Sequence, residues 1–539
     1  MGENFGKIET VRRIFVLVLG MLALAFGLAW VSTGFASVQG SLVFFAAILL
    51  AAGLLFAAGC LLSSDVRPPS ALSLQSPIIK LLFLAALLRL GAGAVWYTAL
   101  PRWGYGNPAE TAGYVMSDAF ERDTAAWELA QSDCPLMDAF RARSFRAVDQ
   151  YGGLLFVSAG LYRLTGGAAH QPLLMVVFAA AFSALAVLFT WGFALRLWGG
   201  RTAMLAAWVT ALFPDAVLLG SSQMREAFTM TLAMMAFYGL VLVLRAGTRR
   251  GLAWIFAALL LALPLSPLFA VMLAGFLLVF AFFLVERERL RDWRLWLGLG
   301  GMLLLALGAV WLLGDRLLPG AASDPLTLLH RWMRAAAHWQ AYYSERASGW
   351  MQKIFRTTPE ALHPWILLVY GVMRPFLPAA LFDLVSNPLW RGIAVWRSAG
   401  WALMLPFLTV APLWAWKQKG FRSPETGVSL LVWAAILAAS FRGGGDQWDN
   451  PRYRVAWIGL QAALSAWVWA SARETRSPWL RRTLVSMGLI LLWWVPWYLR
   501  RVTPLSWPVS DIFLTFGLGL LSAGLYLMWD LWRERRDGG

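Results

Sequence analysis

Apolar runs of about 20 residues recur along the whole chain, and each is long enough to cross a bilayer as a helix. Charged residues make up 14% of the chain, whereas a soluble domain carries roughly a quarter. The sequence therefore predicts an all-α polytopic membrane protein with about fourteen transmembrane helices. The expected spans are 14–34, 41–62, 79–100, 171–196, 202–220, 226–245, 252–267, 269–286, 293–314, 394–416, 427–441, 454–471, 482–500 and 510–531.

Lys and Arg gather in short loops between the apolar runs, which is the usual signal for the cytoplasmic side. With these loops inside, both chain ends lie in the cytoplasm and two long polar stretches, 101–168 and 315–391, lie outside. The same loops account for the net charge of +17, so nucleic-acid binding is not expected. We expect a multi-pass protein of a bacterial inner (plasma) membrane with its active site facing outside.

Four regions follow from this topology. Residues 1–77 form an N-terminal pair of extra spans, and residues 78–314 form a core that includes the acidic loop 101–168. Residues 315–391 form the second extracytoplasmic loop, with half-buried or re-entrant pieces, and 392–539 carry the C-terminal spans. Within the first loop, residues 151–166 are short and bounded by glycine, so we expect a helix lying along the interface.

Residues 116–130 form a polar, acid-rich stretch directly after a span, in a chain otherwise compatible with hydrocarbon. Asp118, Glu121 and Asp123 lie within six residues, at spacings that bring at least two carboxylates onto one side of a helical turn. Such acids should meet water or a substrate at the membrane surface. This stretch is therefore the expected centre of any chemistry.

Three further polar segments converge on the outer face in this topology. Ionisable groups at membrane depth cost several kcal/mol unless they are paired or solvated, so by default they indicate a functional cavity. The segments are Asp215 with 221–226 (Ser-Ser-Gln-Met-Arg-Glu), the second loop with His330, His338, Glu345, His363 and Arg374, and 443–454 with Asp446, Asp449, Arg452, Tyr453 and Arg454.

Each of these features also has a structural interpretation. Asp118 could cap the start of its helix, and Arg225 with Glu226 could be a structural pair at a span end. Arg452 and Arg454 could reach toward lipid headgroups. Residues 443–445 are a glycine turn rather than a phosphate cradle, because the Lys and Ser/Thr of a P-loop are absent from the sequence.

Metal and redox chemistry have little support in the sequence. The four histidines are too scattered for a zinc site. Cys60 and Cys134 are expected at opposite membrane faces, so a disulfide between them is not expected.

Several short motifs resemble one family of membrane enzymes. Residues 123–130 resemble its pattern of an Asp, an aromatic residue four positions on, and a small residue; 151–166 resemble its loop-closing helix, with glycines where prolines are common. Residues 213–215 and 221–226 resemble an outer turn after its third span, and 450–454 (Asn-Pro-Arg-Tyr-Arg) the start of a late helix. Together they resemble the GT-C superfamily of membrane glycosyltransferases, in particular the protein O-mannosyltransferase and aminoarabinose transferase family.

The resemblance covers about residues 78–475 and implies inverting transfer of a sugar from a polyprenyl-phosphate-linked donor to a lipid, glycan or protein acceptor at the outer face. Asp123 or Asp118 would act as general base, and both positions remain open. The family also leaves room for a divalent cation, Mg or Mn, although no residue set here requires one. Candidate donor-phosphate ligands are Arg225, Arg374, Arg452 and Arg454, and candidate pocket residues are Glu226, Tyr151, His338, Asp446 and Tyr453.

Two other functions fit parts of the sequence. A lipid-linked oligosaccharide polymerase or ligase would use arginines and a His of the second loop, and would not need the acids of the first. A non-enzymatic lipid or solute transporter would need ionisable or helix-breaking positions at mid-bilayer in paired halves, whereas the charges here, Arg89 apart, sit at span ends. Substituting Asp118 and Asp123 by Asn separates the enzyme from the transporter.

Overall fold

The computed structural model describes residues 2–33, 38–63, 76–166, 169–285, 349–382, 387–446, 448–501 and 503–537, with isolated residues between 297 and 342. Every regular element within these ranges is a helix. The helices are α1 (Gly2–Thr33), α2 (Val38–Ser63), α3 (Pro77–Trp103), α4 (Pro108–Thr111), α5 (Ser117–Gln131), α6 (Asp138–Arg141), α7 (Arg143–Val148), α8 (Gly153–Thr165), α9 (Pro172–Trp198), α10 (Gly200–Leu212), α11 (Pro214–Gly220), α12 (Glu226–Ala246), α13 (Arg250–Leu265), α14 (Pro267–Leu284), α18 (Gly349–Thr357), η3 (Glu360–Leu362), α19 (His363–Met373), α20 (Leu377–Phe382), α21 (Pro388–Lys419), α22 (Pro424–Gly443), α23 (Asp449–Val455), α24 (Ile458–Glu474), α25 (Pro478–Leu499) and α26 (Ile512–Asp537).

The described residues contain ten helices long and apolar enough to cross a membrane, or up to twelve if each of two bent pairs counts as one span. The protein is thus an integral, multi-pass, all-helical membrane protein. The expected number of fourteen is not established: α13 has only 16 residues, and most of the expected span at 293–314 lies outside the described residues.

Six helices begin with the same local signal, a Ser or Asn followed by Pro. In each, the side-chain oxygen of the first residue accepts a backbone N–H of the first turn, and the Pro occupies the first helical position, where its missing N–H costs nothing. The helices are α3, α4, α14, α21, α22 and α25. These caps determine the residue at which each of the six helices begins.

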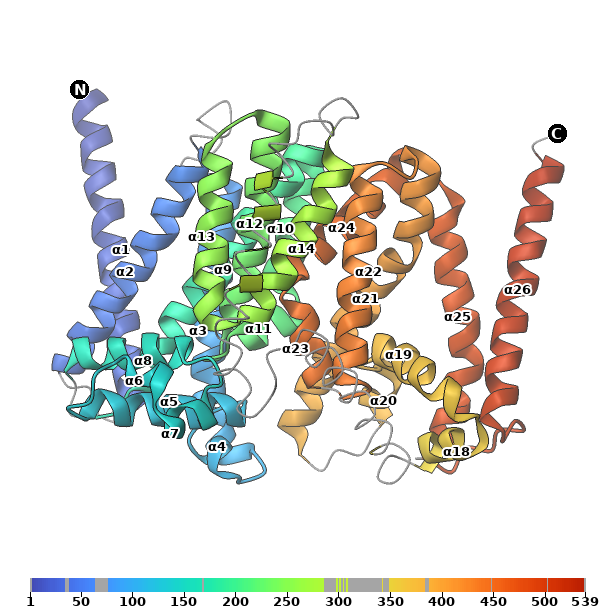
Figure 1. Cartoon of the computed structure of the whole chain (residues 1–539), viewed down its shortest axis with the longest axis horizontal. Helices are drawn as coiled ribbons and strands as arrows, with labels where there is room; N and C mark the ends of the chain where they lie inside the picture. Colours follow the sequence, from blue (N-terminus) through green and yellow to red (C-terminus); the bar gives the residue numbers. More distant parts are fainter. Residues whose placement is uncertain are drawn as a thin grey trace.

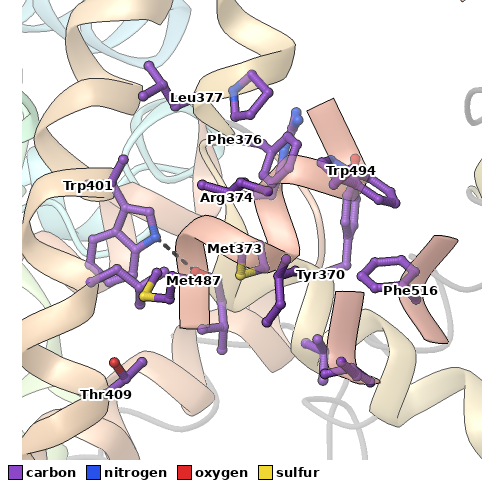
Figure 2. Close-up of a pocket in the computed structure, with 18 of the residues that line it drawn as sticks. Tyr370, Met373, Arg374, Phe376, Leu377, Trp401, Thr409, Met487, Trp494 and Phe516 are labelled. Carbon is purple, nitrogen blue, oxygen red and sulfur yellow. Dashed lines mark hydrogen bonds between the residues drawn. The ribbon is translucent and has the colours of Figure 1, made fainter. Parts of the chain in front are cut away.

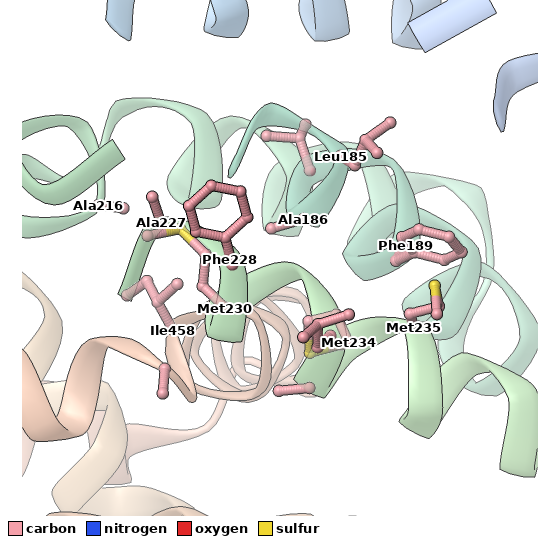
Figure 3. Packing of buried hydrophobic residues seen from close by; sticks show 14 of the residues in the cluster. Leu185, Ala186, Phe189, Ala216, Ala227, Phe228, Met230, Met234, Met235 and Ile458 are labelled. Carbon is pink, nitrogen blue, oxygen red and sulfur yellow. The ribbon is translucent and has the colours of Figure 1, made fainter. Parts of the chain in front are cut away.

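Helices α9 and α12 form the centre of the molecule, where 89% of the residues in each apolar window are buried. Figure 3 shows part of their packing, with Phe189 of α9 next to Met235 of α12. Close packing with α24 requires a glycine at 459, because a Cβ there would overlap the Met234 side chain. This rigid centre supports the polar elements at one end of the bundle.

Two helical hairpins flank the centre, α1–α2 on one side and α25–α26 on the other (Figure 1). Only 17% of the apolar window is buried in α1 and in α25, so both present most of their apolar surface to lipid. The first turn of α1 and the last turn of α26 lie at the same end of the bundle, here called the terminus face, and α4–α8 lie at the opposite end, here called the loop face.

The span expected at 202–220 is broken into α10 and α11, which meet at 56° where Pro214 follows Phe213. Arg89 of α3 lies at this break and donates hydrogen bonds to the Thr210 and Ala211 carbonyls. A guanidinium is stabilised at the C-terminal end of a helix, where carbonyls lack partners. Arg89, the one charge expected within a span, thus pairs with carbonyls that the break leaves without partners.

Candidate active site

Helix α5 carries Asp118 and Asp123 on different sides, because five residues correspond to a rotation of about 140°. Asp123 points into the protein and is only 1% exposed. The side chain of Asp118 is 50% exposed and lies toward α23. The two acids that the sequence could not separate therefore occupy different environments.

Asp123 is held by three side chains from other elements. The Tyr114 and Tyr162 hydroxyls donate to its two carboxylate oxygens at 2.6 and 2.7 Å, and His170 Nε2 lies 2.9 Å from Oδ2. The His170 ring stacks on Trp127, with the ring centroids 5.2 Å apart. Asp123 thus ties α5 to the segment before it, to α8 and to the start of α9.

Burial raises the pKa of Tyr114 and of Tyr162, and the negative charge of Asp123 raises both pKa values further. Both hydroxyls therefore stay protonated and remain donors to the carboxylate at any physiological pH. Enclosed in this way, Asp123 has no surface on which an acceptor molecule could lie.

Asp118 belongs to a cluster centred on Arg452 of α23. The Arg452 guanidinium lies 3.0 Å from Asp118, 3.3 Å from Glu226 and 3.2 Å from Asp449. One oxygen of Glu226 is buried without a hydrogen-bond partner. We call Asp118, Glu226, Asp449 and Arg452 the Arg452 cluster.

A second group of charges lies beside this cluster. Asp149 accepts a hydrogen bond from Arg225 at 2.7 Å and lies 3.8 Å from the Arg122 guanidinium. Arg225 also stacks over the ring of Tyr151, 4.6 Å from its centroid. The suggested structural pair of Arg225 with Glu226 is therefore wrong: each side chain bonds to a distant segment, because neighbouring side chains at a helix start point in different directions.

Short helix α23 separates two environments. Arg452 and Arg454 are two residues apart and so point to nearly opposite sides of the helix. Arg454 is 2% exposed, lies 3.6 Å over the Trp401 ring and donates to the Arg374 carbonyl at 2.6 Å. Arg454 therefore holds the backbone at Arg374 in place, and it is not accessible to a substrate.

A large groove lies on the Arg454 side of α23, with a volume of about 1740 Å³. Its walls include α18, α19, α20, α21, α25 and α26, and most of its lining is apolar. Figure 2 shows Arg374 between Trp401 and Trp494, with Thr409 further along from Trp401. Arg374 also donates to the Gly445 carbonyl at 2.9 Å, which fixes the guanidinium at the groove wall.

The groove and the Arg452 cluster meet at the start of α23. Asp446 lines the groove and accepts the backbone N–H groups of Trp448 and Asp449 at 2.7 and 2.6 Å. Asp449 in turn bonds Arg452, which bonds Asp118. A continuous set of polar contacts therefore leads from the groove to the exposed carboxylate of α5.

The remaining predicted residues lie at the margins or outside the described part of the chain. Tyr453 has the guanidinium of Arg442 5.8 Å from its ring centroid. His363 is buried, with Nε2 3.1 Å from the Thr358 carbonyl. His330, His338 and Glu345 lie outside the described residues.

Sequence reasoning missed the partners that decide the environment of each acid. Tyr114, Tyr162, His170 and Asp149 carry no local motif, and Arg397, which bonds Asp215, lies far along the chain. Asp149 and Arg397 could have been found from their charge, because charged residues are rare in this chain.

The carboxylates near the site share Arg452 rather than surround a free cation position. In the described part of the chain, no group of three or more His, Cys, Asp or Glu residues could hold a metal ion. No step below depends on a metal.

No protein-family model matches the chain, and no curated protein matches it. Among solved structures, the chain is similar to the archaeal oligosaccharyltransferase AglB from Archaeoglobus fulgidus in complex with an inhibitory peptide and a dolichol-phosphate, at 14% identity and a TM-score of 0.39 over 83% of this chain and 56% of that one. The oligosaccharyltransferase of the same organism in complex with Zn and sulfate matches at 14% identity and a TM-score of 0.39, over 82% and 53%. The chain spans about half the length of these proteins. At these scores the likeness assigns no donor, acceptor or site residue to this chain.

Proposed function

We propose that the protein is a membrane glycosyltransferase of the GT-C type, which moves a sugar from a polyprenyl-phosphate-linked donor to an acceptor at the extracytoplasmic face. One observation carries this proposal. An exposed carboxylate, Asp118, lies beside the Arg452 guanidinium, one short helix away from a large apolar groove that Arg374 lines.

The dimensions of the groove support a long lipid as the donor. Along α21 its lining runs from Trp401 to Lys417, a rise of about 24 Å at about 1.5 Å per residue. The hydrocarbon core of a bilayer is about 30 Å thick, so the tail of an ordinary phospholipid reaches about half that depth. A groove of this length suits a tail that crosses both leaflets.

Arg374 is the best-placed ligand for the donor phosphate. It lines the groove between α19 and α20, and its guanidinium is already oriented by the Gly445 carbonyl. An arginine presents planar, charge-assisted donors to phosphate oxygens. The negative charge that develops on the leaving phosphate would be stabilised there.

In this reaction the acceptor hydroxyl oxygen forms a bond to the anomeric carbon as the bond from that carbon to the phosphate oxygen breaks. The electron pair leaves with the phosphate, and the hydroxyl proton passes to a carboxylate. Attack opposite the leaving group inverts the anomeric configuration. We assign the base to Asp118 rather than Asp123, because Asp118 is open to an acceptor and Asp123 is enclosed by three donors.

The test follows release of free polyprenyl phosphate by mass spectrometry, from the purified full chain mixed with lipids of its host membrane. Free polyprenyl phosphate forms whichever sugar and acceptor the enzyme uses. Asp118→Asn should lower the release rate by about 100-fold or more, the usual contribution of a general base. Glu121→Gln, which changes an exposed acid one turn along α5, is the matched control and should keep the wild-type rate. Equal rates for both variants would contradict the assignment.

A further inference from the structure

The groove continues to the terminus face, well beyond the part that a sugar phosphate would occupy. Its lining follows α25 from Trp479 to Tyr498, a rise of about 28 Å at about 1.5 Å per residue. That length matches the hydrocarbon core of a bilayer, about 30 Å. The end near Trp479 is therefore where a tail anchored at Arg374 would stop.

Polar side chains line the groove at this end. Lys417 of α21 and Arg482 of α25 both lie over the Trp479 ring, with the Lys417 Nζ 5.6 Å and the Arg482 Cζ 4.9 Å from its centroid. All three residues line the groove. Cations over an indole face hold the ring in place.

Arg482 is fixed by a second set of contacts. Its guanidinium bonds Asp530 and Glu534 of α26, each at 2.7 Å, and the residue is only 2% exposed. An arginine that merely reached for lipid headgroups would leave its guanidinium in water. Arg482 instead joins α25 and α26 at the base of the groove.

We propose that Trp479 and Arg482 set the longest lipid tail that the groove accepts. An apolar tail that passed Trp479 would lie against a buried, ion-paired guanidinium, and desolvating such a group is costly. A tail that is too short leaves groove surface unfilled, which forfeits apolar burial. The inference rests on the proposed function, since it takes the donor to be a polyprenyl phosphate.

The test measures binding of farnesyl, heptaprenyl and undecaprenyl phosphate to the purified full chain by native mass spectrometry. Trp479→Ala removes the ring that ends the groove and should raise the affinity for undecaprenyl relative to farnesyl phosphate by several-fold. Ser486→Phe fills the groove about 10 Å nearer to Arg374. It should lower the same ratio by about tenfold, as expected when roughly two methylene groups lose their burial.

Trp532→Ala is the matched control, because it removes an exposed indole of α26 that does not line the groove, and it should leave the ratio unchanged. If Trp479→Ala fails to fold, Ser486→Phe still tests the proposal. If all three lipids bind but the affinity ratio changes in neither Trp479→Ala nor Ser486→Phe, the length-setting role alone is overturned. Wild-type protein that binds none of the three would overturn the donor assignment of the proposed function as well.

Discussion

At the scale of single residues, burial separates two acids that the sequence presents as equivalents. Asp118 and Asp123 lie on one helix in one polar stretch, and both were expected in the site. The difference comes from Tyr162 and His170, which lie 39 and 47 residues further along the chain. Such long-range contacts leave no periodic signal in α5 itself, so the sequence could locate the acidic helix but could not choose its functional acid.

Asp123→Asn should destabilise the fold, in contrast to Asp118→Asn. The amide replaces a charged acceptor by a group with its own N–H donors, which face the hydroxyls of Tyr114 and Tyr162. We expect a loss of about 2 kcal/mol in the free energy of unfolding, seen as a lower midpoint in thermal unfolding in detergent. Asp118→Asn, at an exposed side chain, should leave the midpoint within error. A stable Asp123→Asn protein would show that these contacts do not hold α5.

Tyr162 should not ionise at the ordinary tyrosine pKa of about 10. Burial and the charge of Asp123 raise its pKa, so folding stabilises the neutral form. That contribution to stability is complete below about pH 10 and is lost only as the pH rises through the higher pKa of the folded state. In an absorbance titration of the twelve tyrosines, Tyr162→Phe should therefore leave the amplitude near pH 10 unchanged. Loss of one full tyrosinate equivalent near that pH would contradict the enclosed site.

At the scale of elements, hydropathy and glycine positions predicted where many helices lie, but not the residue at which each begins or the break between α10 and α11. The Ser-Pro and Asn-Pro starts, the glycine-bounded interfacial helix α8 and the acidic helix α5 all follow from nearby residues. The 75° bend between α23 and α24 does not. A contact with a distant segment, the Arg454 hydrogen bond to the Arg374 carbonyl, lies at this bend.

Helix α8 should depend on the absence of a side chain at Gly153. A Cβ there would overlap the backbone carbonyl of Pro264 at the end of α13. Gly153→Ala should therefore cost about 1–3 kcal/mol in the free energy of unfolding, as overpacking does. Gly160→Ala in the same helix is the control, because its nearest neighbour would lie at an ordinary 3.8 Å. Thermal unfolding of the two variants should differ clearly, and equal midpoints would contradict the close packing of α8 on α13.

At the scale of the whole molecule, the sequence predicted the membrane-spanning class but not which spans are neighbours. Hydropathy and charge report the length and direction of each span. They do not report that α21 faces α25 and α26 across a groove, or that α23 separates this groove from the Arg452 cluster. Both depend on helix packing in three dimensions, and helices that face lipid and helices that line a groove have similar apolar sequences.

The central claim, that the groove holds the donor lipid with its phosphate at Arg374, is tested most directly by photo-crosslinking. Undecaprenyl phosphate with a diazirine near the middle of its tail is bound to the purified full chain, irradiated and mapped by peptide mass spectrometry. We predict adducts on groove-lining residues of α21 and α25, such as Leu413 and Met487, which decrease in Arg374→Ala but not in the control Arg536→Ala. Adducts confined to the lipid-facing surface of α1 and α2, and insensitive to Arg374→Ala, would contradict the account.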